Sequence, residues 1–334
     1  MKRAMISNGQ TNISFALAKL KEWGGKTMKK ARIIYNPTSG REAFKKELAT
    51  VLERFEVAGY ETSAHATTCE GDAIHAARIA VERGFDLVVA AGGDGTINEV
   101  INGLAEQENR PKLGIIPVGT TNDFARALSI PRDIKKAVDV ILEDQSMFLD
   151  IGRVNDHYFM NIAGGGKLTE LTYEVPSKLK TMLGQLAYYM KGMEMLPSLK
   201  PIRAKIEYDD NIIDEDIMLF LVSNTNSVGG FEKLAPEANM HDGYFDLLIL
   251  RKTNLAEFIR IASLALRGAH LDDKNVIYAK AKKIKVTTDE KMQLNIDGEF
   301  GGLLPGEFIN LQEHIEFFVP KAFMEKEMNR ELPS

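Results

Sequence analysis

The sequence predicts an α/β domain followed by a second, mainly antiparallel β domain. Up to about Asp150, short apolar runs alternate with segments whose apolar residues recur at helical spacing, which favours a right-handed, mostly parallel sheet. Beyond Asp150, strand-like runs follow one another with Asp-Gly or Asp-Asn turns, and helical stretches interrupt them at about 177–195 and 254–268. At 334 residues, the chain has enough material for a core in each of two domains.

The clearest strand–turn–helix unit is DLVVAAGGDGTINEVINGL, residues 86–104. Its first residues are an apolar run typical of a strand buried on both faces, and the apolar residues after Gly95 recur at helical spacing. We expect Thr96 to be the N-cap, in a capping box with Glu99. Glycines let backbone approach a ligand closely, and a helix N-terminus suits phosphate. Asp94 fits such a loop if Mg²⁺ lies between it and the phosphates; the alternative is a tight turn with a polar tip.

Two further polar turns follow predicted strands. Residues 36–40 follow the strand 31–35, and residues 119–123 follow the strand 113–118, with a helix after each turn. Thr120 and Asp123 repeat the spacing of a capping box. Because ligands of α/β sheets bind outside the carboxyl ends of the strands, we expect all three turns at one edge. Three such turns, two of which carry a carboxylate, favour a nucleotide or phosphate site over plain turns.

The composition excludes several classes of protein. A net charge of −5 gives no global basic field for nucleic acid. The single cysteine, Cys69, excludes an internal disulfide and fits a cytoplasmic location, and it forms no zinc-ligand spacing with the histidines. No apolar run approaches the ~20 residues of a membrane span. Residues 1–27 precede the first predicted strand and are interpreted as an extension outside the fold.

The run GGDGTINEVING, preceded by NPTSG and followed by PVGTTNDFAR, resembles the diacylglycerol kinase catalytic family, which includes sphingosine, ceramide and bacterial lipid kinases. The resemblance extends from about Lys29 to about Pro320 and is strongest to the soluble bacterial members. It implies a doubly wound αβα nucleotide domain over 28–150 and a β-sandwich lipid-substrate domain over 151–309. The active site would lie in the cleft between them, and the chain at about 310–325 would return to the first domain.

The resemblance also implies ATP as co-substrate, Mg²⁺ as cofactor, and conversion of diacylglycerol to phosphatidic acid for phospholipid recycling. The implied nucleotide contacts are Asn36, Pro37, Thr38, Ser39, Gly40, Thr67, Gly93, Asp94, Gly95, Thr96, Ile97, Asn98, Glu99 and Thr120. The implied catalytic residues are Glu299, as the base, with Asp297, Asp94 and Asp123. A structural Mg²⁺ is implied at the Asp242 carboxylate and at the main-chain carbonyls of Asn239 and Tyr244. Without the resemblance, Asp297-Gly298-Glu299 is typical of a simple hairpin turn.

Residues 177–195 carry Lys178, Lys180 and Lys191 among several methionines. A basic amphipathic helix can lie on an anionic membrane, although the same pattern is typical of a helix packed on its own domain. A lipid substrate such as diacylglycerol requires peripheral contact with the membrane surface, here the inner face. A homodimer is left open.

Other functions fit the same residues. One alternative is a kinase that acts on another lipid alcohol, such as sphingosine or ceramide. A second is a kinase that acts on NAD, since NAD kinases share a GGDGT loop. A third alternative is a non-catalytic nucleotide- or lipid-binding sensor. Loss of Asp94 or Glu299 would favour the sensor, but both residues are present.

Overall fold

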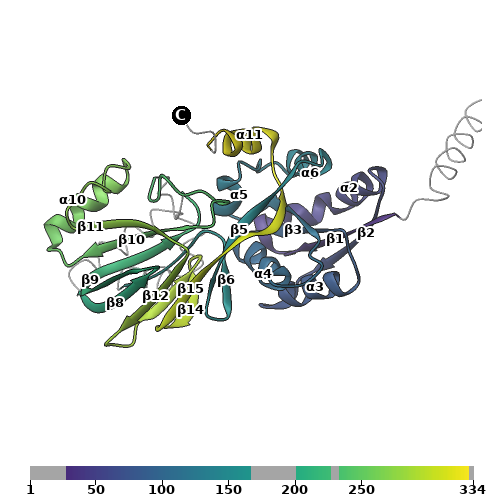
Figure 1. The fold of residues 1–334 in the computed structure, drawn as a ribbon. Helices are drawn as coiled ribbons and strands as arrows, with labels where there is room; N and C mark the ends of the chain where they lie inside the picture. Colours follow the sequence, from purple (N-terminus) through teal and green to yellow (C-terminus); the bar gives the residue numbers. More distant parts are fainter. Residues whose placement is uncertain (1–27, 167–200, 227–232, 331–334) are drawn as a thin grey trace, which may run out of the picture.

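The computed structural model describes residues 28–166, 201–226 and 233–330. The expected extension, residues 1–27, and the helix expected at 177–195 lie outside these ranges. Figure 1 shows two regions side by side, an α/β region on the right and a β-rich region on the left. This is the predicted fold class, an α/β domain with a parallel sheet and a mainly antiparallel β domain, and it is confirmed.

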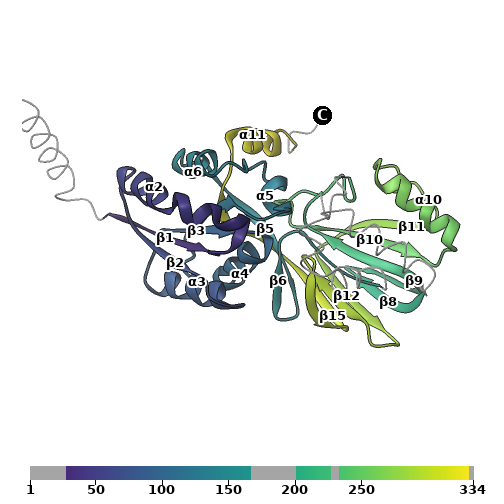
Figure 2. The same cartoon turned by 180° about the vertical axis from the view of Figure 1, so that it is seen from behind.

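The first region is a doubly wound α/β layer structure. Its sheet runs in the order β2 (Tyr60–Ala66), β1 (Lys29–Tyr35), β3 (Leu87–Gly92) and β4 (Lys112–Pro117), with neighbouring strands parallel. Helices α2 (Ala43–Val57) and α6 (Ile134–Leu142) cover one face, and α3 (Asp72–Glu82) and α4 (Asp94–Leu104) cover the other (Figures 1 and 2). A short 3-10 turn, η1 (Ser39–Glu42), and the short helix α5 (Asp123–Ala127) follow β1 and β4.

The parallel sheet is buried on both faces, as its composition requires. Every residue of β3, LVVAAG, is buried, which fits a strand with helices on both sides. Gly103 allows α3 and α4 to approach closely, because a Cβ at this position would lie 2.5 Å from the carbonyl oxygen of Ile74. One apolar cluster unites the strands with the inner faces of the helices, so the strand ends are held rigidly.

The second region is built from antiparallel strands. In chain order they are β5 (Ser146–Val154), β6 (His157–Phe159), β7 (Ile162–Gly166), β8 (Ile202–Tyr208), β9 (Asn211–Ser223), β10 (Phe245–Arg251), β11 (Val276–Ala281), β12 (Lys283–Thr288), β13 (Gln293–Ile296), β14 (Glu299–Leu303) and β15 (Gly306–Phe318). Large apolar side chains such as Phe159, Phe220 and Phe245 fill its core. Helix α10 (Leu255–Ala265) begins with a capping box at Asn254 and packs over a smaller cluster.

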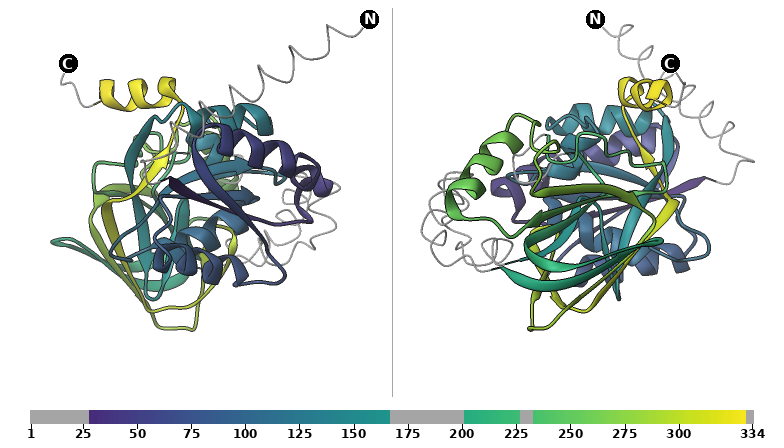
Figure 3. Two further views of the ribbon diagram at one scale, coloured as in Figure 1. Left: turned by 90° about the vertical axis from the view of Figure 1, so that its right-hand side faces the viewer. Right: turned by 60° about the vertical axis from the view of Figure 1, so that its left-hand side comes forward.

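Strand β15 links the two regions. It pairs with β12 and, along most of its length, with β5, whereas Phe317 near its end pairs parallel with Leu113 of β4. Figure 3 shows it crossing from the β-rich region to the α/β region, where α11 (Lys321–Arg330) follows. Phe323 of α11 joins the α/β core. The two regions therefore share one continuous path of hydrogen-bonded strands.

Two local predictions are wrong. Helix α4 begins at Asp94, after the N-cap Gly93, and Glu99 accepts a hydrogen bond from the backbone N–H of Ala73, so Thr96 and Glu99 form no capping box. Helix α5 likewise begins after Asn122, which adopts a left-handed conformation, rather than at a box formed by Thr120.

The chain also breaks between β6 and β7, at Met160 and Asn161. The N–H groups of these two residues donate to the carboxylate of Asp297, at 2.8 and 2.9 Å, instead of joining a strand ladder. The carboxylate of Asp297 therefore takes the place of a strand partner for the backbone at this break.

Candidate active site

The three polar turns meet at the carboxyl ends of β1, β3 and β4, as the sequence predicted. A Cβ at Gly119 would lie 2.5 Å from the Cα of Gly93, so these two turns touch through their glycines. Gly40 adopts a φ of 57°, and a Cβ there would lie 2.4 Å from the carbonyl oxygen of Val118. Larger residues would force the turns apart, which explains the glycines.

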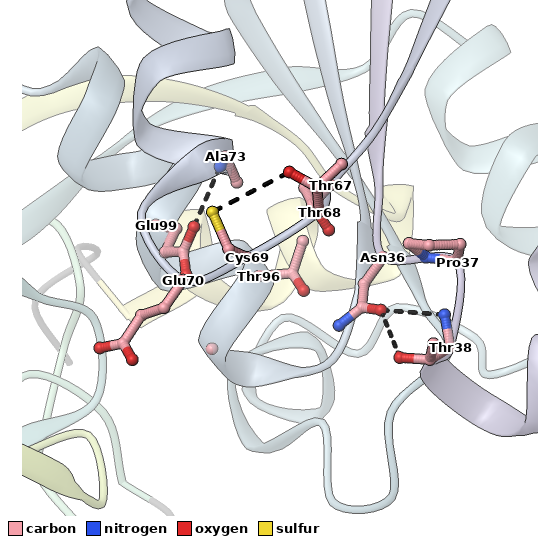
Figure 4. Close-up of a pocket in the computed structure, with 11 residues that line it drawn as sticks. Asn36, Pro37, Thr38, Thr67, Thr68, Cys69, Glu70, Ala73, Thr96 and Glu99 are labelled. Carbon is pink, nitrogen blue, oxygen red and sulfur yellow. Dashed lines mark hydrogen bonds between the residues drawn. The ribbon is translucent and has the colours of Figure 1, made fainter.

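A pocket of about 630 Å³ opens beside these turns. Its lining comes from the ends of β1 and β2 and from the start of α3 and α4 (Figure 4): Asn36, Pro37, Thr38, Thr67, Thr68, Cys69, Glu70, Ala73, Gly95, Thr96 and Glu99. Asn36 fixes the first wall, because its Oδ1 accepts from the N–H and the hydroxyl of Thr38 at 3.0 and 2.8 Å. Seven of the fourteen predicted nucleotide contacts line this pocket.

The wall after β2 was largely missed by the sequence reasoning, which named only Thr67 there. Thr68 donates from its N–H and its hydroxyl to one oxygen of Asp72, at 2.8 and 2.9 Å. His65 binds the other oxygen at 3.0 Å. The backbone hydrogen bond from Thr68 holds the pKa of Asp72 below its usual range. Because this turn also follows a parallel strand, the rule that located the other three turns would have located it too.

Asp94 joins two of the turns. Its Oδ2 accepts from the hydroxyl of Thr121 at 3.0 Å, and its Oδ1 accepts from the N–H of Phe124 at 3.3 Å. A carboxylate has about four acceptor positions, so this one keeps capacity for a cation. Asp123 forms an ion pair with Arg126, with 3.1 Å between Oδ1 and Nη2. Arg126 and Arg132 also donate to the carbonyls of Thr121 and Thr120 in the 119–123 turn.

Glu299 reaches the same place from the β-rich region. It is the first residue of β14, and its Oε1 lies 3.2 Å from where a Cβ on Gly95 would stand. Gly95 lies in the first turn of α4, next to Asp94. The structure therefore brings the predicted base to the start of the helix that carries Asp94.

Asp297 differs from the other predicted catalytic residues. Its Oδ2 accepts from Met160 N–H and Asn98 Nδ2, at 2.8 and 3.1 Å. Its Oδ1 accepts from the N–H groups of Asn161 and Ile162, at 2.9 and 3.0 Å. Burial raises the pKa of this carboxyl group, against the opposing effect of its hydrogen bonds. Its oxygens face protein donors, an arrangement that does not favour binding of a metal ion.

Some predicted nucleotide contacts do not line the pocket. Ile97 is fully buried in the α/β core, and its N–H donates to the carbonyl of Gly93. Asn98 points toward Asp297 and the Tyr158 carbonyl. The others belong to the three turns beside the pocket: Ser39, Gly40, Gly93, Asp94 and Thr120. Glu99 lines the pocket, but its Oε2 accepts from Ala73 N–H at 3.0 Å.

The residues of the predicted structural metal site lie apart from the pocket, in the loop just before β10. Asp242 forms an ion pair with Lys280, with 2.7 Å between Oδ2 and Nζ, and its Oδ1 accepts from Tyr244 N–H at 3.0 Å. Asn239 uses its side-chain oxygen to accept from His241 N–H. In the parts of the chain that the structure describes, no three Asp, Glu, His or Cys side chains form a metal-binding group. A metal here would depend on main-chain carbonyls.

Two buried carboxyl groups border Asp242 and were not predicted. Burial raises the pKa of Asp150 and of Asp246 to about 6, and the charge of Asp242 adds to both effects. Asp150 accepts from the N–H groups of Gly243 and Glu313, each at 2.7 Å. Asp246 accepts from the hydroxyl of Tyr278 through one oxygen, and its other oxygen is buried without a hydrogen-bond partner.

Comparison with known proteins identifies the family. The diacylglycerol kinase catalytic domain matches residues 30–154, and the YegS C-terminal NAD kinase beta sandwich-like domain matches residues 171–322. A diacylglycerol kinase of Bacillus subtilis strain 168 is 68% identical over 300 residues, which cover 90% of this chain and 99% of that protein. A diacylglycerol kinase of Staphylococcus epidermidis is 56% identical, covering 90% of this chain and 95% of that protein.

Solved structures agree with this assignment. One crystal structure from Bacillus anthracis str. Sterne has a TM-score of 0.77 at 28% identity, covering 90% of this chain and all of that one. A second, of a diacylglycerol kinase from the same organism, has a TM-score of 0.71 at 26% identity and the same coverage. The chain belongs to the diacylglycerol kinase catalytic domain family, and the comparisons support a lipid kinase. Among the described helices, none has the length and apolar character to cross a membrane.

Proposed function

We propose that this lipid kinase transfers a phosphoryl group from ATP to diacylglycerol and yields phosphatidic acid, at the inner face of the membrane. The observation that carries the proposal is the approach of Glu299 to the first turn of α4, beside Asp94 and a pocket of about 630 Å³. A volume of this size is typical of small-molecule sites. Relatives named diacylglycerol kinase over almost their whole length support the choice of lipid.

The nucleotide would occupy the pocket, with its phosphates toward the start of α4. The positive end of the helix dipole and the N–H groups of its first turn suit phosphate oxygens. Asp94 retains acceptor capacity after its bonds to Thr121 and Phe124, so it is the residue that we expect to hold Mg²⁺. Mg²⁺, when bound, would neutralise charge on the phosphates during transfer.

Glu299 is the proposed general base. As the lipid hydroxyl oxygen forms its bond to the transferred phosphorus, the bond to the leaving nucleotide oxygen breaks and the hydroxyl proton moves to Glu299. Regular secondary structure would hold both reacting partners. Gly95, on the nucleotide side, belongs to α4, and Glu299, the proposed base, begins β14. Asp123, paired with Arg126, is a further carboxylate at the same edge.

We also propose a structural Mg²⁺ at Asp242, with the carbonyls of Asn239 and Tyr244. The acidic group around it supports this site, because Asp242 lies close enough to the buried carboxyl groups of Asp150 and Asp246 for its charge to add to the effect of burial on their pKa values. Lys280 supplies part of that charge. The proposed role is structural, since the loop that holds Asp242 packs against β5 and β15 through Asp150.

The test is incubation of the pure protein with γ-labelled ATP, Mg²⁺ and vesicles that contain diacylglycerol, a sphingoid lipid or a ceramide. Parallel reactions contain NAD, because the C-terminal domain that matches residues 171–322 is described as NAD kinase beta sandwich-like. We expect label in phosphatidic acid alone. Label in another lipid or in NADP would replace the proposed substrate, and hydrolysis without transfer, or no turnover, would contradict the proposed reaction.

A further inference from the structure

One face of α4 contacts the β-rich region through a row of polar side chains. Asn98 and Asn102 are four residues apart, so they lie on one side of the helix, and Glu106 follows just after the helix ends at Leu104. The Nδ2 atoms of Asn98 and Asn102 each donate to the carbonyl of Tyr158 at 3.2 Å, and Tyr158 N–H donates back to Asn102 at 3.1 Å. Glu106 binds Arg153 at 2.8 Å and accepts from the Tyr158 hydroxyl.

Asn98 has a second partner, and that partner lies two residues before the proposed base. Its Nδ2 donates to Oδ2 of Asp297 at 3.1 Å. The backbone N–H groups of residues 160–162 supply three more donors to the same carboxylate. Asp297 therefore joins α4, the link between β6 and β7, and the turn that leads into β14.

The turn itself leaves little freedom between Asp297 and Glu299. Asp297 and Gly298 both adopt left-handed conformations, with φ of 49° and 92°, as in a tight two-residue hairpin. The Asp297 N–H donates to the Ile162 carbonyl at 2.8 Å, and the Gly298 N–H donates to Asn295 Oδ1 at 3.0 Å. Fixing the Asp297 carboxylate therefore fixes where β14 and Glu299 begin.

We propose that Asn98 and Asp297 are positioning residues that hold Glu299 against the start of α4. This inference rests on the proposed function, in which Glu299 is the base. Asp94 begins α4 and Asn98 lies about one turn later, roughly 6 Å along the axis, so one rigid helix places both the nucleotide side and the base side. Helix α4 would thus fix the position of the nucleotide, at its first turn, and also the position of the hairpin that carries the base.

The alternative role for Asp297, a metal ligand, fits its surroundings less well. A carboxylate offers about four acceptor positions, and four donors already occupy them. A cation would have to displace donors of this set, three of which are backbone N–H groups. Metal binding and positioning also respond differently to added Mg²⁺, which makes them separable.

The primary variant is Asn98→Ala, because it removes one donor and leaves the buried carboxylate with its backbone partners. We expect kcat to fall about 10- to 100-fold, since displacement of a reacting group by about 1 Å has effects of that size. KM for ATP should stay within about twofold, and raising Mg²⁺ should not restore kcat. Tyr158→Phe is the matched control, because it removes another side-chain bond between the two regions, to Glu106 just after the end of α4, and should leave kcat near wild type.

Four outcomes would overturn the proposal. An unchanged kcat in Asn98→Ala would show that the contact does not position Glu299. A raised KM for ATP with unchanged kcat would return Asn98 to the nucleotide site. Recovery at high Mg²⁺ would make the Asn98–Asp297 pair part of a metal site. An equal loss in Tyr158→Phe would reduce the effect to a general loosening of the contact between the two regions.

A reversed pair gives a rescue test. Asn98→Asp alone places two carboxylates face to face, and Asp297→Asn alone loses the acceptor of several bonds. In the double variant, the amide at position 297 can donate to the carboxylate at position 98. The kcat of the double variant should therefore exceed that of both single variants. A double-mutant cycle measures this coupling. A double variant no better than the product of the single effects would contradict the pairing.

Hydrogen exchange provides a readout that needs no turnover. In Asp297→Asn, the N–H groups of Met160, Asn161 and Ile162 should exchange faster, while those of β3 stay protected. Unchanged exchange at residues 160–162 would refute the anchor. This result stands even if Glu299→Gln retains activity, in which case the proposed base is wrong and the anchor remains.

Discussion

The two acidic groups of this molecule differ in how their charge is compensated. At the sheet edge, Asp94 accepts from Thr121 and Phe124, and Asp123 is paired with Arg126. In the β-rich region, Asp150 and Asp246 are almost fully buried beside Asp242, and their pKa values are raised to about 6. The sheet-edge group lies beside a pocket, whereas the other is the place where we propose a structural cation. The same residue type is therefore the proposed ligand of a catalytic ion in one place and of a structural ion in the other.

The largest expected effect comes from Asp94→Ala. The substitution removes the carboxylate that we expect to hold Mg²⁺ against the phosphates, so turnover should be abolished. The side chain is half-buried at the rim of a turn, so the melting temperature should stay near that of the wild type. Steady-state assays and thermal unfolding measure both. Full activity would reject the nucleotide-site assignment at this edge.

Glu299→Gln keeps the shape of the side chain and removes its basic oxygen. We expect kcat to fall by about 10²- to 10⁴-fold, the usual range for general-base catalysis, with ATP binding and the melting temperature unchanged. Single-turnover kinetics isolate the chemical step. A variant within a few-fold of the wild type in that step would leave Asp123 as the next base to test.

Asp242→Ala should affect both stability and activity, in contrast to Asp94→Ala. Metal binding couples to folding, so the loss of a structural ligand lowers the melting temperature in Mg²⁺ and reduces activity indirectly. Thermal unfolding with Mg²⁺ and with chelator separates the two states, and the variant should lose most of the difference between them. Equal stability and full activity would show that the Asp242-Gly243 turn is only a turn.

A smaller effect concerns pH. The pKa of Asp246 is raised from 3.8 to about 6, so the native state keeps a proton that the unfolded chain has lost. Its contribution to the free energy of unfolding is therefore complete below pH 4 and is lost as the pH rises through about 6. Asparagine does not ionise, so Asp246→Asn should not lose this part of the free energy of unfolding as the pH rises. The difference in pKa makes the loss in the wild type about 2–3 kcal/mol.

Urea unfolding of the metal-free protein at pH 4 and at pH 7 measures this effect. The variant should gain stability relative to the wild type between those two values, and Mg²⁺ should shrink the gain. A difference that does not change with pH would show that Asp246 keeps its ordinary ionisation.

The sequence predicted the α/β fold and the shared edge well, because strand and helix periods are local and the carboxyl-end rule is general. It predicted single residues of the GGDGTINEVING run less well. A helix turns by about 100° per residue, so Ile97 faces the core, Asn98 faces the β-rich region and Glu99 faces α3. The motif match implied a nucleotide contact for all three residues, although each faces a different part of the structure.

The role of Asp297 depends on partners that are distant in the chain. Its donors lie at residues 160–162 and at Asn98, so no local pattern separates this buried anchor from an exposed ligand. Asp150 and Asp246 were missed for a related reason. Each lies within a strand, and its significance comes from burial and from the charge of Asp242, neither of which the sequence spacing reveals.

The measurement that tests the central claim most directly is calorimetric titration of Mg²⁺, alone and with a non-hydrolysable ATP analogue, into the wild type, Asp94→Ala and Asp242→Ala. The account predicts that Mg²⁺ alone binds the wild type and Asp94→Ala but not Asp242→Ala. It predicts that the Mg²⁺–analogue complex binds the wild type and Asp242→Ala, whereas Asp94→Ala loses this binding. Retention of tight Mg²⁺–analogue binding by Asp94→Ala would contradict the assignment of the sheet-edge carboxylate to the nucleotide.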